Sequence, residues 1–319
     1  MASLLRDVYE RQVLLCAAAA VGLTFAGCHS PVSREIRALG VRSEASEQSC
    51  TLRKNGNFIT IYPGSLRANF NGGWVHLVEP AQRTEGKSGV YSLSEANLKK
   101  VVAPLLNREV APAKPVRMIL IDPGHGGSET GATGAKHQEK TLNFALAQRI
   151  RDELVKRGFT VKMTRDTDKD VSLDARGNLS GTLKADLFIS VHHNAAGNRT
   201  GTGVETFAMT PDGCRSTGGG AVPKQATLSN RYDGANLNLA QEIQSRLVKA
   251  TGGPDRGVKF ARFRVLVKAH CPAVLVEAGF ITTPKEELAI ADPARQRKVA
   301  AAVADGVEAF NRRTAAMKK

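Results

Sequence analysis

The sequence predicts an α/β protein with a twisted, mostly parallel sheet of about six strands and helices on both faces, preceded by a small β-rich α+β module. Short apolar runs alternate with helical patterns from residue 117 onward, and this alternation is typical of a parallel sheet covered by helices. Residues 50–108 instead contain several strand-like segments and a strong hairpin signal. The length of 319 residues allows one large domain or two unequal ones.

The module 50–108 is predicted to be mainly β. Asn71-Gly72-Gly73 separates two β-prone segments and is typical of a hairpin turn. Residues 93–106 have the apolar spacing of a short amphipathic helix. The predicted strands are 51–53, 58–62, 66–70 and 74–78. This layout resembles the small domain at the N-terminus of copper amine oxidases and in many cell-envelope proteins; a spacer without a binding role is the alternative.

In the region 117–312, strands are predicted at short apolar runs, and helices where apolar residues recur with helical spacing. In the helix predicted over 139–157, Leu142, Leu146 and Ile150 form one stripe and Gly158 ends it. The predicted strands are 118–121, 160–164, 186–191, 204–209, 264–267 and 273–276. The other predicted helices are 173–183, 237–250 and 292–310.

The composition is that of an ordinary globular protein with a basic surplus. Apolar residues make up 42% and charged residues 24% of the chain, which excludes wholesale disorder. The formal net charge of +15 favours anionic surroundings. The sequence has no zinc-finger, helix-turn-helix, Walker or G-x-G-x-x-G motif, and its basic residues are not interleaved with aromatic ones. No nucleic-acid or nucleotide partner is therefore expected.

The N-terminus has the features of an export signal. Residues 13–27 are apolar or small over about the length of a signal-peptide core, which is short for a spanning helix. Phe25-Ala26-Gly27-Cys28 resembles the lipobox of bacterial lipoproteins, in which the cysteine is acylated after cleavage. Cys28 is therefore a candidate lipidation residue. We expect an exported protein of the cell envelope or periplasm, membrane-anchored if Cys28 is acylated; plain secretion and a buried N-terminal helix are the alternatives.

The cysteines do not predict a disulfide scaffold. If Cys16 is removed and Cys28 is acylated, Cys50, Cys214 and Cys271 remain, and three thiols cannot all pair within one chain. One bond between Cys214 and Cys271 and three unpaired thiols are the two alternatives. The sequence has no C-x-x-C motif, so a thiolate metal site has little support.

The remaining boundaries follow from composition. Residues after the leader are polar and poor in aromatics, as in a tether, and Pro112 and Pro115 indicate a linker. The predicted divisions are 1–28 signal peptide and lipobox, 29–49 tether, 50–108 module, 109–116 linker, 117–312 α/β domain and 313–319 basic tail.

Four polar residues stand where predicted strands end or a helix begins. His125 follows the first strand of the α/β domain, Glu139 opens the long helix, and His192 and Glu277 end two buried strands. The carboxyl ends of parallel strands share one edge of a sheet, where ligands bind. Two imidazoles and one carboxylate form a catalytic zinc set that leaves one position open. Taken singly, the histidines also fit loop positions and Glu139 fits a helix start, but Glu277 closes a buried strand and needs a partner or a function.

These residues lie in segments that resemble the zinc-dependent N-acetylmuramoyl-L-alanine amidases, which cleave bacterial peptidoglycan. The resemblance covers residues 117–312 as the catalytic domain. The matching segments, in family order, are Ile121-Asp-Pro-Gly-His-Gly-Gly127, Glu139-Lys140, Thr164-Arg165-Asp166, Leu187-Phe-Ile-Ser-Val-His192 with Asn194, and Pro272-Ala-Val-Leu-Val-Glu277 with Gly279-Phe280-Ile281.

The resemblance implies one zinc ion per chain, held by His125, Glu139 and His192, with Glu277 as the catalytic carboxylate. The Ser-x-His spacing of the family favours His192 over the adjacent His193 as the ligand. Asn194 is a candidate for orienting the substrate, with a loop hydrogen bond as its alternative role.

The implied reaction is zinc-dependent hydrolysis of the amide bond between N-acetylmuramic acid and L-alanine in peptidoglycan, for cell-wall remodelling or daughter-cell separation. Glu277 would take a proton from water and pass it to the departing amine. We expect a monomer, and the sequence does not indicate any activator. Some members of this family carry a helix inserted in the catalytic domain that blocks the zinc site. Here the interval between residues 209 and 237 is rich in glycine and lacks glutamate, so we expect a flexible loop and an open zinc site. A loop that orders locally and partly covers the cleft without binding zinc is the alternative.

Two other functions are compatible with parts of this pattern. The first is a different zinc hydrolase, such as a carboxypeptidase or a carbohydrate deacetylase. Funnel-type carboxypeptidases usually contain His-x-x-Glu, and His125-Gly-Gly-Ser128 lacks that glutamate. The second is a non-catalytic envelope-binding protein with a decayed site, and the presence of all four key residues argues against it.

Overall fold

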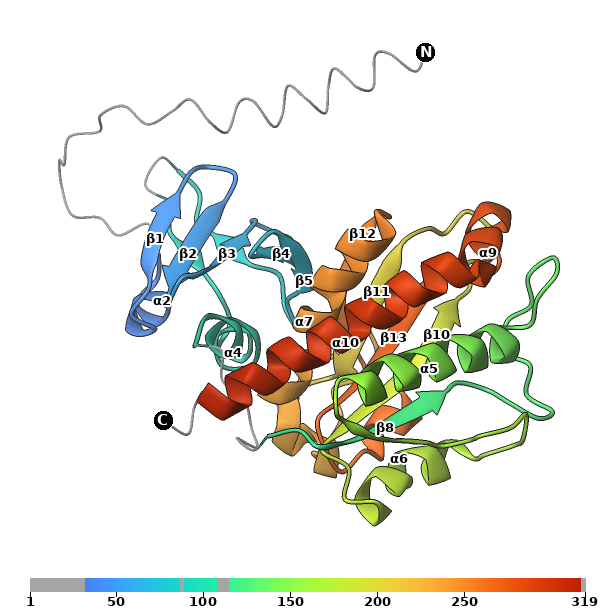
Figure 1. The fold of residues 1–319 in the computed structure, drawn as a ribbon. Helices are drawn as coiled ribbons and strands as arrows, with labels where there is room; N and C mark the ends of the chain where they lie inside the picture. Colours follow the sequence, from blue (N-terminus) through green and yellow to red (C-terminus); the bar gives the residue numbers. More distant parts are fainter. Residues whose placement is uncertain (1–31, 87–88, 108–114, 317–319) are drawn as a thin grey trace, which may run out of the picture. The chain divides into compact units, whose positions relative to one another are not determined.

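The computed structural model describes residues 32–86, 89–107 and 115–316, with side chains as far as residue 313. These residues belong to one compact unit, whose strands and helices are drawn in Figure 1. The predicted signal peptide with Cys28, the start of the predicted tether, most of the predicted linker and the last residues of the predicted tail lie outside the described residues. Among the described residues, no helix is long and apolar enough to cross a membrane.

One sheet of 11 strands runs through this unit, in the order β1-β2-β3-β4-β5-β12-β11-β13-β10-β8-β9. The module supplies β1 (Arg42–Ala45), β2 (Cys50–Lys54), β3 (Asn57–Ile61), β4 (Arg67–Phe70) and β5 (Gly73–His76). The C-terminal part supplies β8 (Met118–Pro123), β9 (Thr160–Met163), β10 (Leu187–Asn194), β11 (Val204–Met209), β12 (Asp255–Ala261) and β13 (Ala273–Phe280). The short strands β6 (Gln82–Arg83) and β7 (Tyr91–Ser92) pair separately.

The sheet is larger than the predicted six strands because the module extends it. Strand β5 pairs with β12 through Val75 and Val258, and the N–H of Trp74 donates to Asp255 Oδ2 at 2.9 Å. An edge strand leaves a row of backbone groups unpaired, and β5 satisfies some of those on β12. Within the C-terminal part, the pairings are parallel except for β11 with β13. The predicted mixed α/β fold with a mostly parallel sheet is therefore confirmed, and its predicted size is corrected.

Helices cover both faces of the C-terminal strands. Alternation along β8 sends Ile119 and Ile121 into one core and Leu120 into another. Figure 1 shows α5 and α6 on opposite sides of β8. The helices on the α5 side are α5 (Glu139–Lys156), α7 (Asp233–Thr251) and α10 (Pro293–Ala316), and those on the other side are α6 (Leu173–Thr182) and α8 (Arg264–Val267). The remaining helices are α2 (Arg34–Ala38), α3 (Glu95–Asn97), the π-turn η1 (Leu98–Val102), α4 (Ala103–Asn107), the 3₁₀ turn η2 (Leu228–Tyr232) and α9 (Pro284–Ala291).

Several segments differ from the sequence prediction. The predicted tether contains α2 and β1: Ile36 is fully buried, and β1 pairs with β2, so residues 34–45 are part of the folded module. The predicted strand 264–267 is the helix α8, whose Val265 and Leu266 pack into the same core as Leu120, on the face of the sheet opposite α5. Helix α10 continues to Ala316, into the predicted basic tail. The sequence did not predict strand β12.

The three described cysteines settle one open alternative. Cys50, Cys214 and Cys271 are all buried, and none forms a disulfide within the described residues. The bond between Cys214 and Cys271 is therefore not present in this structure.

Candidate metal centre

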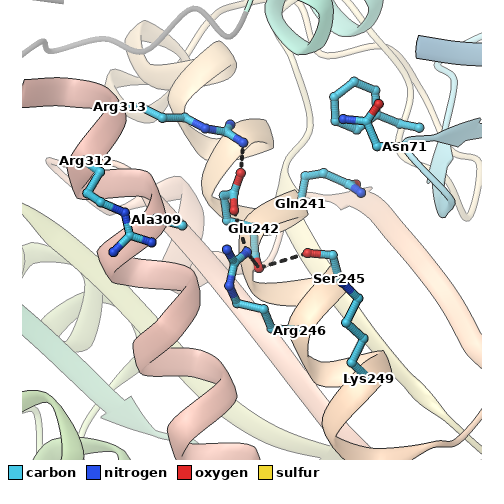
Figure 2. Close-up of a pocket in the computed structure, with 10 residues that line it drawn as sticks. Asn71, Gln241, Glu242, Ser245, Arg246, Lys249, Ala309, Arg312 and Arg313 are labelled. Atoms are coloured by element: carbon cyan, nitrogen blue, oxygen red, sulfur yellow. Dashed lines mark hydrogen bonds and ion pairs between the residues drawn. The ribbon is translucent and has the colours of Figure 1, made fainter. Parts of the chain in front are cut away.

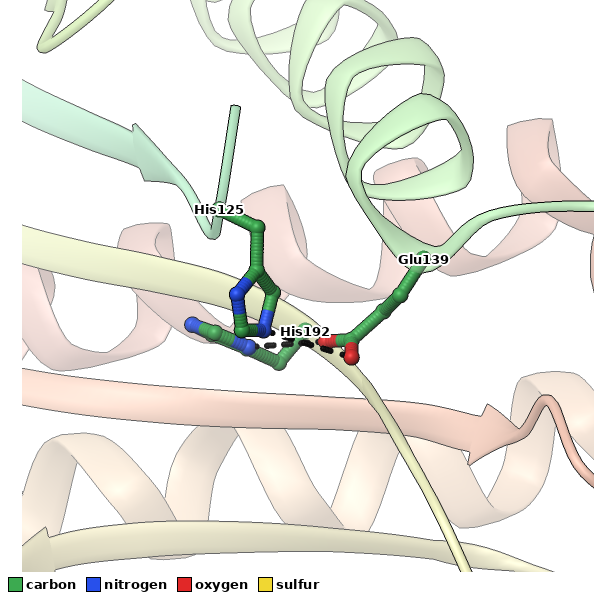
Figure 3. Close-up of side chains that lie close together, drawn as sticks. All are labelled: His125, Glu139 and His192. Carbon is green, nitrogen blue, oxygen red and sulfur yellow. Dashed lines mark hydrogen bonds and ion pairs between the residues drawn. The ribbon is translucent and has the colours of Figure 1, made fainter. Parts of the chain in front are cut away.

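The three predicted metal ligands meet at the carboxyl edge of the sheet. His125 follows β8, Glu139 is the first residue of α5, and His192 lies near the end of β10. Their ligand atoms all lie within 4.8 Å of one another. His125 Nε2 is 3.3 Å from Glu139 Oε2, and His192 Nδ1 is 2.9 Å from Glu139 Oε1, as Figure 3 shows. Two imidazole nitrogens and one carboxylate oxygen suit zinc with an open fourth position.

The backbone at His125 has an unusual conformation. Its φ is +59°, a left-handed value that costs a non-glycine residue about 1–3 kcal/mol. Gly126 and Gly127 continue the turn with φ values of +134° and +59°, which glycine adopts readily. The His125 carbonyl accepts a hydrogen bond from Arg176 Nη2 at 2.7 Å. The turn that presents His125, the first candidate ligand, is thus fixed by a side chain from α6.

Two buried arginines support this turn. Arg176 Nη1 donates to the Pro123 carbonyl at 2.7 Å. Arg165 donates from Nε to the same carbonyl at 3.0 Å and from Nη2 to the Gly124 carbonyl at 3.2 Å. Three successive carbonyls before and at the ligand therefore accept from guanidinium groups. Hydrogen bonds to charged groups are stronger than neutral ones, so this loop is well fixed.

Asp122 balances the charge of Arg176. Its carboxylate is fully buried and accepts from Arg176 Nη1 at 2.9 Å, Thr164 Oγ1 at 2.6 Å and Ser190 Oγ at 2.8 Å. The donors come from α6, the end of β9 and β10. One buried carboxylate therefore connects three elements beneath the loop that bears His125.

Glu139 is held by donors as well as by the two histidines. The N–H of Ala132 donates to Oε2 at 2.9 Å, and Asn143 Nδ2, one helical turn along α5, donates to Oε1 at 3.1 Å. Burial raises the pKa of Glu139, but hydrogen bonds with His125 and His192 and their charges outweigh it and hold this pKa below its ordinary value. The carboxylate is therefore ionised, as a metal ligand needs to be.

Two glycines leave the space that a metal and its ligands need. A Cβ on Gly131 would lie 2.5 Å from His125 Cδ2 and 2.7 Å from Glu139 Oε2. A Cβ on Gly124 would lie 2.2 Å from the His192 ring. In addition, the buried His125 Nδ1 has no hydrogen-bond partner among the described residues. The residues present therefore fit a bound cation.

The structure distinguishes His192 from His193. Consecutive residues of a strand point to opposite faces, and only His192 joins the metal cluster. His193 Nδ1 lies 2.8 Å from Asn143 Oδ1, and its ring lies among residues of α5, α9 and α10. Burial lowers the pKa of His193 to about 4, so it is neutral at pH 7. His193 is thus a core residue in the described structure.

Glu277 lies in the strand next to His192. The register pairs His192 with Glu277 across β10 and β13, and Glu277 with Glu205 across β13 and β11. Paired residues point to the same face of a sheet, so the three side chains form a row. Burial raises the pKa of Glu277 well above its ordinary value, the charges of Glu139 and Glu205 raise it further, and Lys259 lowers it. Its buried Oε2 has no hydrogen-bond partner among the described residues.

Glu205 ends this row and had no predicted role. Its carboxylate is buried and accepts from Arg256 Nε at 2.9 Å and Lys259 Nζ at 2.5 Å, both on β12. It also accepts from Asn194 Nδ2 at 2.6 Å, while Asn194 Oδ1 accepts from the N–H of Ala195 at 2.7 Å. Asn194 therefore makes structural hydrogen bonds, and its contact with a substrate stays a prediction.

The interval between β11 and α7 contains no long helix. Only η2 interrupts it, and α7 begins directly afterwards. Asp233, the first residue of α7, accepts from Asn230 Nδ2 and from the N–H of Asp212, each at 3.0 Å. Neither acidic residue belongs to the described metal cluster. This arrangement agrees with the prediction that no inserted helix lies in this interval.

The sequence of this centre matches a known family. Residues 119–309 match the family described as N-acetylmuramoyl-L-alanine amidase, and this match covers more than half of the chain. The chain belongs to this family. The predicted family and enzyme class are therefore confirmed: the chain is an N-acetylmuramoyl-L-alanine amidase by family, as its resemblance had implied. The match does not include the module, whose own resemblance stays a prediction.

Individual relatives agree with this assignment. The sporulation-specific N-acetylmuramoyl-L-alanine amidase of Bacillus subtilis is 36% identical over 196 residues, which cover 60% of this chain and 68% of that protein. The N-acetylmuramoyl-L-alanine amidase LytC of the same species is 34% identical over 195 residues, covering 61% of this chain but only 35% of LytC. The crystal structure of an N-acetylmuramoyl-L-alanine amidase from Clostridium difficile 630 superposes with a TM-score of 0.52 at 32% identity, covering 62% of this chain and 97% of that one.

Several supporting residues had no role in the sequence prediction. Arg165 stood in a matching segment, whereas Arg176 stood in a predicted helix with nothing to distinguish it from a surface residue. Glu205 is the second residue of the predicted strand 204–209, where a charge within a buried run was the one available signal. Their partners lie far away along the chain, so spacing alone could not connect them.

Proposed function

We propose that this chain is a zinc-dependent amidase that hydrolyses the amide bond between N-acetylmuramic acid and L-alanine in peptidoglycan. One observation carries the proposal: His125, Glu139 and His192 converge beside Glu277 in a chain of the amidase family. The three convergent side chains would hold one zinc ion per chain. When bound, zinc supplies Lewis acidity, which makes water more acidic and an amide carbonyl more electrophilic.

Glu277 would move the protons of the reaction. Its buried Oε2 has no partner among the described residues and is available to accept a proton from the attacking water. Because its pKa is raised, Glu277 holds a proton more strongly than an ordinary carboxylate does, and a general base can also return the proton as an acid. The proton would then pass to the nitrogen of L-alanine as the amide bond breaks. Lys259 opposes this shift in pKa and would favour the ionised form, which is the form that accepts a proton.

The supporting network would keep these groups in place during turnover. Arg165 and Arg176 fix the carbonyls of the turn at His125, and Glu139 is oriented by Ala132 and Asn143. Rigid positioning of reacting groups is a large part of enzymatic rate enhancement. The side chains of the centre therefore need little rearrangement before they act.

A quantitative test uses purified full-length chain and four matched variants. We expect Glu277→Gln to retain one zinc ion per chain by metal analysis but to lose about 10²–10⁴-fold in activity, the usual contribution of a general base. His125→Ala and His192→Ala should lose both zinc and activity. Glu47→Gln, at an exposed module position, is the control. Near wild-type activity in Glu277→Gln would show that the base is misassigned.

Mass spectrometry of the released products identifies the bond. Free stem peptides and glycan with intact N-acetylmuramic acid are the expected products. Loss of single amino acids from the stem would indicate a carboxypeptidase, and loss of acetyl groups a deacetylase. Binding of peptidoglycan without release of any product would indicate a non-catalytic protein.

We also propose that the chain acts outside the cytoplasmic membrane, where it would serve wall remodelling or daughter-cell separation as a monomer. Its polymeric substrate lies there, and residues 1–28 contain the export and lipobox features. Acylation of Cys28 with two or more chains would give stable anchoring. Cys28→Ser should then shift the protein from the membrane fraction to the soluble envelope fraction. A wild-type protein that is cleaved but already soluble would contradict the lipid anchor and favour plain secretion.

A further inference from the structure

A cavity of about 580 Å³ lies apart from the metal cluster. It is lined by the turn between β4 and β5 and by facing sides of α7 and α10, and Figure 2 shows its residues. None of its lining residues belongs to the metal centre. Its volume is in the range of small-ligand sites.

The lining is strongly cationic. Positions 241, 242, 245, 246 and 249 form one face of α7, because residues spaced by three or four positions share a helix face. Arg246 and Lys249 come from this face, and Arg312 and Arg313 come from α10. Glu242 is the one acidic residue in the lining. The wall therefore keeps a positive surplus that would attract an anion.

Glu242 arranges two of the cations. Its carboxylate accepts from Arg246 Nη1 at 2.5 Å and forms an ion pair with Arg313, as Figure 2 shows. Lys249 makes no hydrogen bond or ion pair with any described residue, and Arg312 lies 3.9 Å from Glu308. These two cations are therefore only weakly engaged by the protein.

A second, independent feature points to a ligand. Gln241 is 5% exposed, and its Oε1 is buried without a hydrogen-bond donor among the described residues. Buried polar atoms in native proteins nearly always have partners, since leaving one unpaired is costly. Because Gln241 lines the cavity, a ligand there could supply the missing N–H donor.

We propose that this cavity binds the carboxylate end of a peptide. A peptide terminus carries both groups that the lining calls for: an anion for Lys249 and Arg312, and a nearby amide N–H for Gln241 Oε1. The stem peptides of peptidoglycan present such ends, so the cavity would hold one stem while the metal centre acts elsewhere on the polymer. This identification of the ligand rests on the proposed function, although the chemistry of the cavity does not.

Calorimetric titration of the full-length chain tests the proposal. The probe is a stem-type tetrapeptide that ends in D-alanine and has a free N-terminus, so it lacks the bond that the metal centre would cleave. We expect Lys249→Ala combined with Arg312→Ala to weaken its binding about tenfold, and Gln241→Met about fivefold, the effects of lost hydrogen bonds to charged and neutral groups. Arg297→Ala with Lys298→Ala, two exposed cations earlier on α10, should leave binding unchanged.

Two probe changes test the ligand chemistry. The same tetrapeptide with a C-terminal carboxamide should bind about tenfold more weakly, because the anion is gone. Inorganic phosphate should compete only weakly, because it cannot place an amide donor at Gln241. Equal binding of the carboxamide, or equal binding by the double variant and the Arg297/Lys298 control, overturns the proposal. Strong competition by phosphate together with no effect of Gln241→Met also overturns it, in favour of a general anion site.

These measurements do not depend on catalysis. Variants are first compared with wild type by thermal unfolding, so that a binding loss is assigned only to folded protein. If the chain failed to cleave peptidoglycan but bound the tetrapeptide as expected, the proposed function would fail and the peptide site would stand. If the chain cleaved peptidoglycan but did not bind the tetrapeptide, the peptide site would fail and the proposed function would stand.

Discussion

Asp122 and Glu205 are two buried carboxylates close to the candidate metal centre, and the protein neutralises them differently. Asp122 is fully buried, and its cationic partner Arg176 has a side chain only 2% exposed. Glu205 is also buried, but the side chains of its partners Arg256 and Lys259 are 39% and 18% exposed. Asp122 therefore belongs to a closed network, whereas Glu205 belongs to an open network that reaches solvent through Arg256 and Lys259.

The difference separates two tasks. Arg176 connects Asp122 to the carbonyl of His125, so this network fixes the geometry of a candidate metal ligand. Glu205 stands opposite Glu277 in the sheet register and holds Asn194, so its network acts on the residues around the base. Damage to the closed network should therefore appear first in stability and metal binding, and damage to the open one in turnover.

The largest effect is expected for Arg176→Met. Removing one partner of a buried ion pair leaves an uncompensated charge and typically costs about 3–5 kcal/mol. The Pro123 and His125 carbonyls would also lose their donors. Urea unfolding should show this loss of stability, and metal titration should show weaker zinc binding.

The matched control for this variant removes the buried charge as well. Adding Asp122→Asn to Arg176→Met should recover part of the lost stability, because the unpaired carboxylate is gone. Zinc binding should stay weak, since the turn at His125 still lacks its donor. A double variant as unstable as the single one would contradict the role given to the buried charge.

Glu287 is a third buried carboxylate, and its charge is stabilised mainly by backbone N–H groups instead of by an arginine. Glu287 accepts from the N–H groups of Ala135, Lys136 and His137 at 2.7–2.8 Å, and His137 Nδ1 lies 3.1 Å away. Burial alone would raise the pKa of Glu287, but these hydrogen bonds lower it to about 2 from 4.5. Glu287 therefore anchors the segment that leads into the candidate ligand Glu139.

Glu287→Gln should lower the free energy of unfolding at pH 7 by about 2 kcal/mol, the scale of hydrogen bonds to a charged group. A carboxylate with a lowered folded-state pKa stabilises the fold above its unfolded-state pKa and loses this contribution as pH falls. The difference in unfolding free energy between wild type and variant should therefore be at its maximum above about pH 5 and should shrink towards pH 2. Unfolding curves across this range measure it, and a gap independent of pH would contradict the assignment.

The sequence predicted the side chains that converge at the candidate metal centre better than those that support them. The four key residues stand at strand ends or a helix start, and the shared edge of a parallel sheet brings such positions together. Asp122, Arg176 and Ser190 form one network only after β8, α6 and β10 have packed, so no local pattern connects them. Local propensity also gave a wrong prediction at α8. The β-branched residues of Arg264–Val267 favour a strand, but they form a helical turn because packing against the sheet outweighs that local preference.

Prediction from local sequence patterns reached the same limit for the module as a whole. Its hairpin was predictable from Asn71-Gly72-Gly73, because that turn chemistry is local. Its pairing with β12 was not, because β12 carries Asp255, Arg256 and Lys259 and lacks an apolar run. Those charges have partners in Trp74 and Glu205, which only the folded structure brings close.

For the open network, we expect Glu205→Gln to lower kcat about tenfold while changing stability and zinc content little. The variant keeps an acceptor for Asn194 but removes the negative charge beside Lys259, so the positive charge of Lys259, which already lowers the pKa of Glu277, would act on Glu277 uncompensated. A shift in the pH profile of kcat would separate this electrostatic effect from a structural one. An unchanged kcat would indicate that Glu205 serves only the packing of the sheet.

The smallest effect is expected for Arg256→Met, which repeats the Arg176 substitution in the open network. Here the carboxylate keeps Lys259 at 2.5 Å and Asn194 at 2.6 Å, and water can reach the position that the guanidinium leaves. A partly exposed ion pair usually contributes less than about 1 kcal/mol, and Arg256 also stacks on Phe280 at 4.8 Å, a contact that methionine can partly replace. We therefore expect a stability loss below about 1 kcal/mol and unchanged zinc content.

The same urea and metal titrations used for Arg176→Met measure both quantities. If the two arginine variants proved equally unstable, solvent exposure would not be what distinguishes the two carboxylates, and the proposed division between geometry and turnover would lose its physical basis.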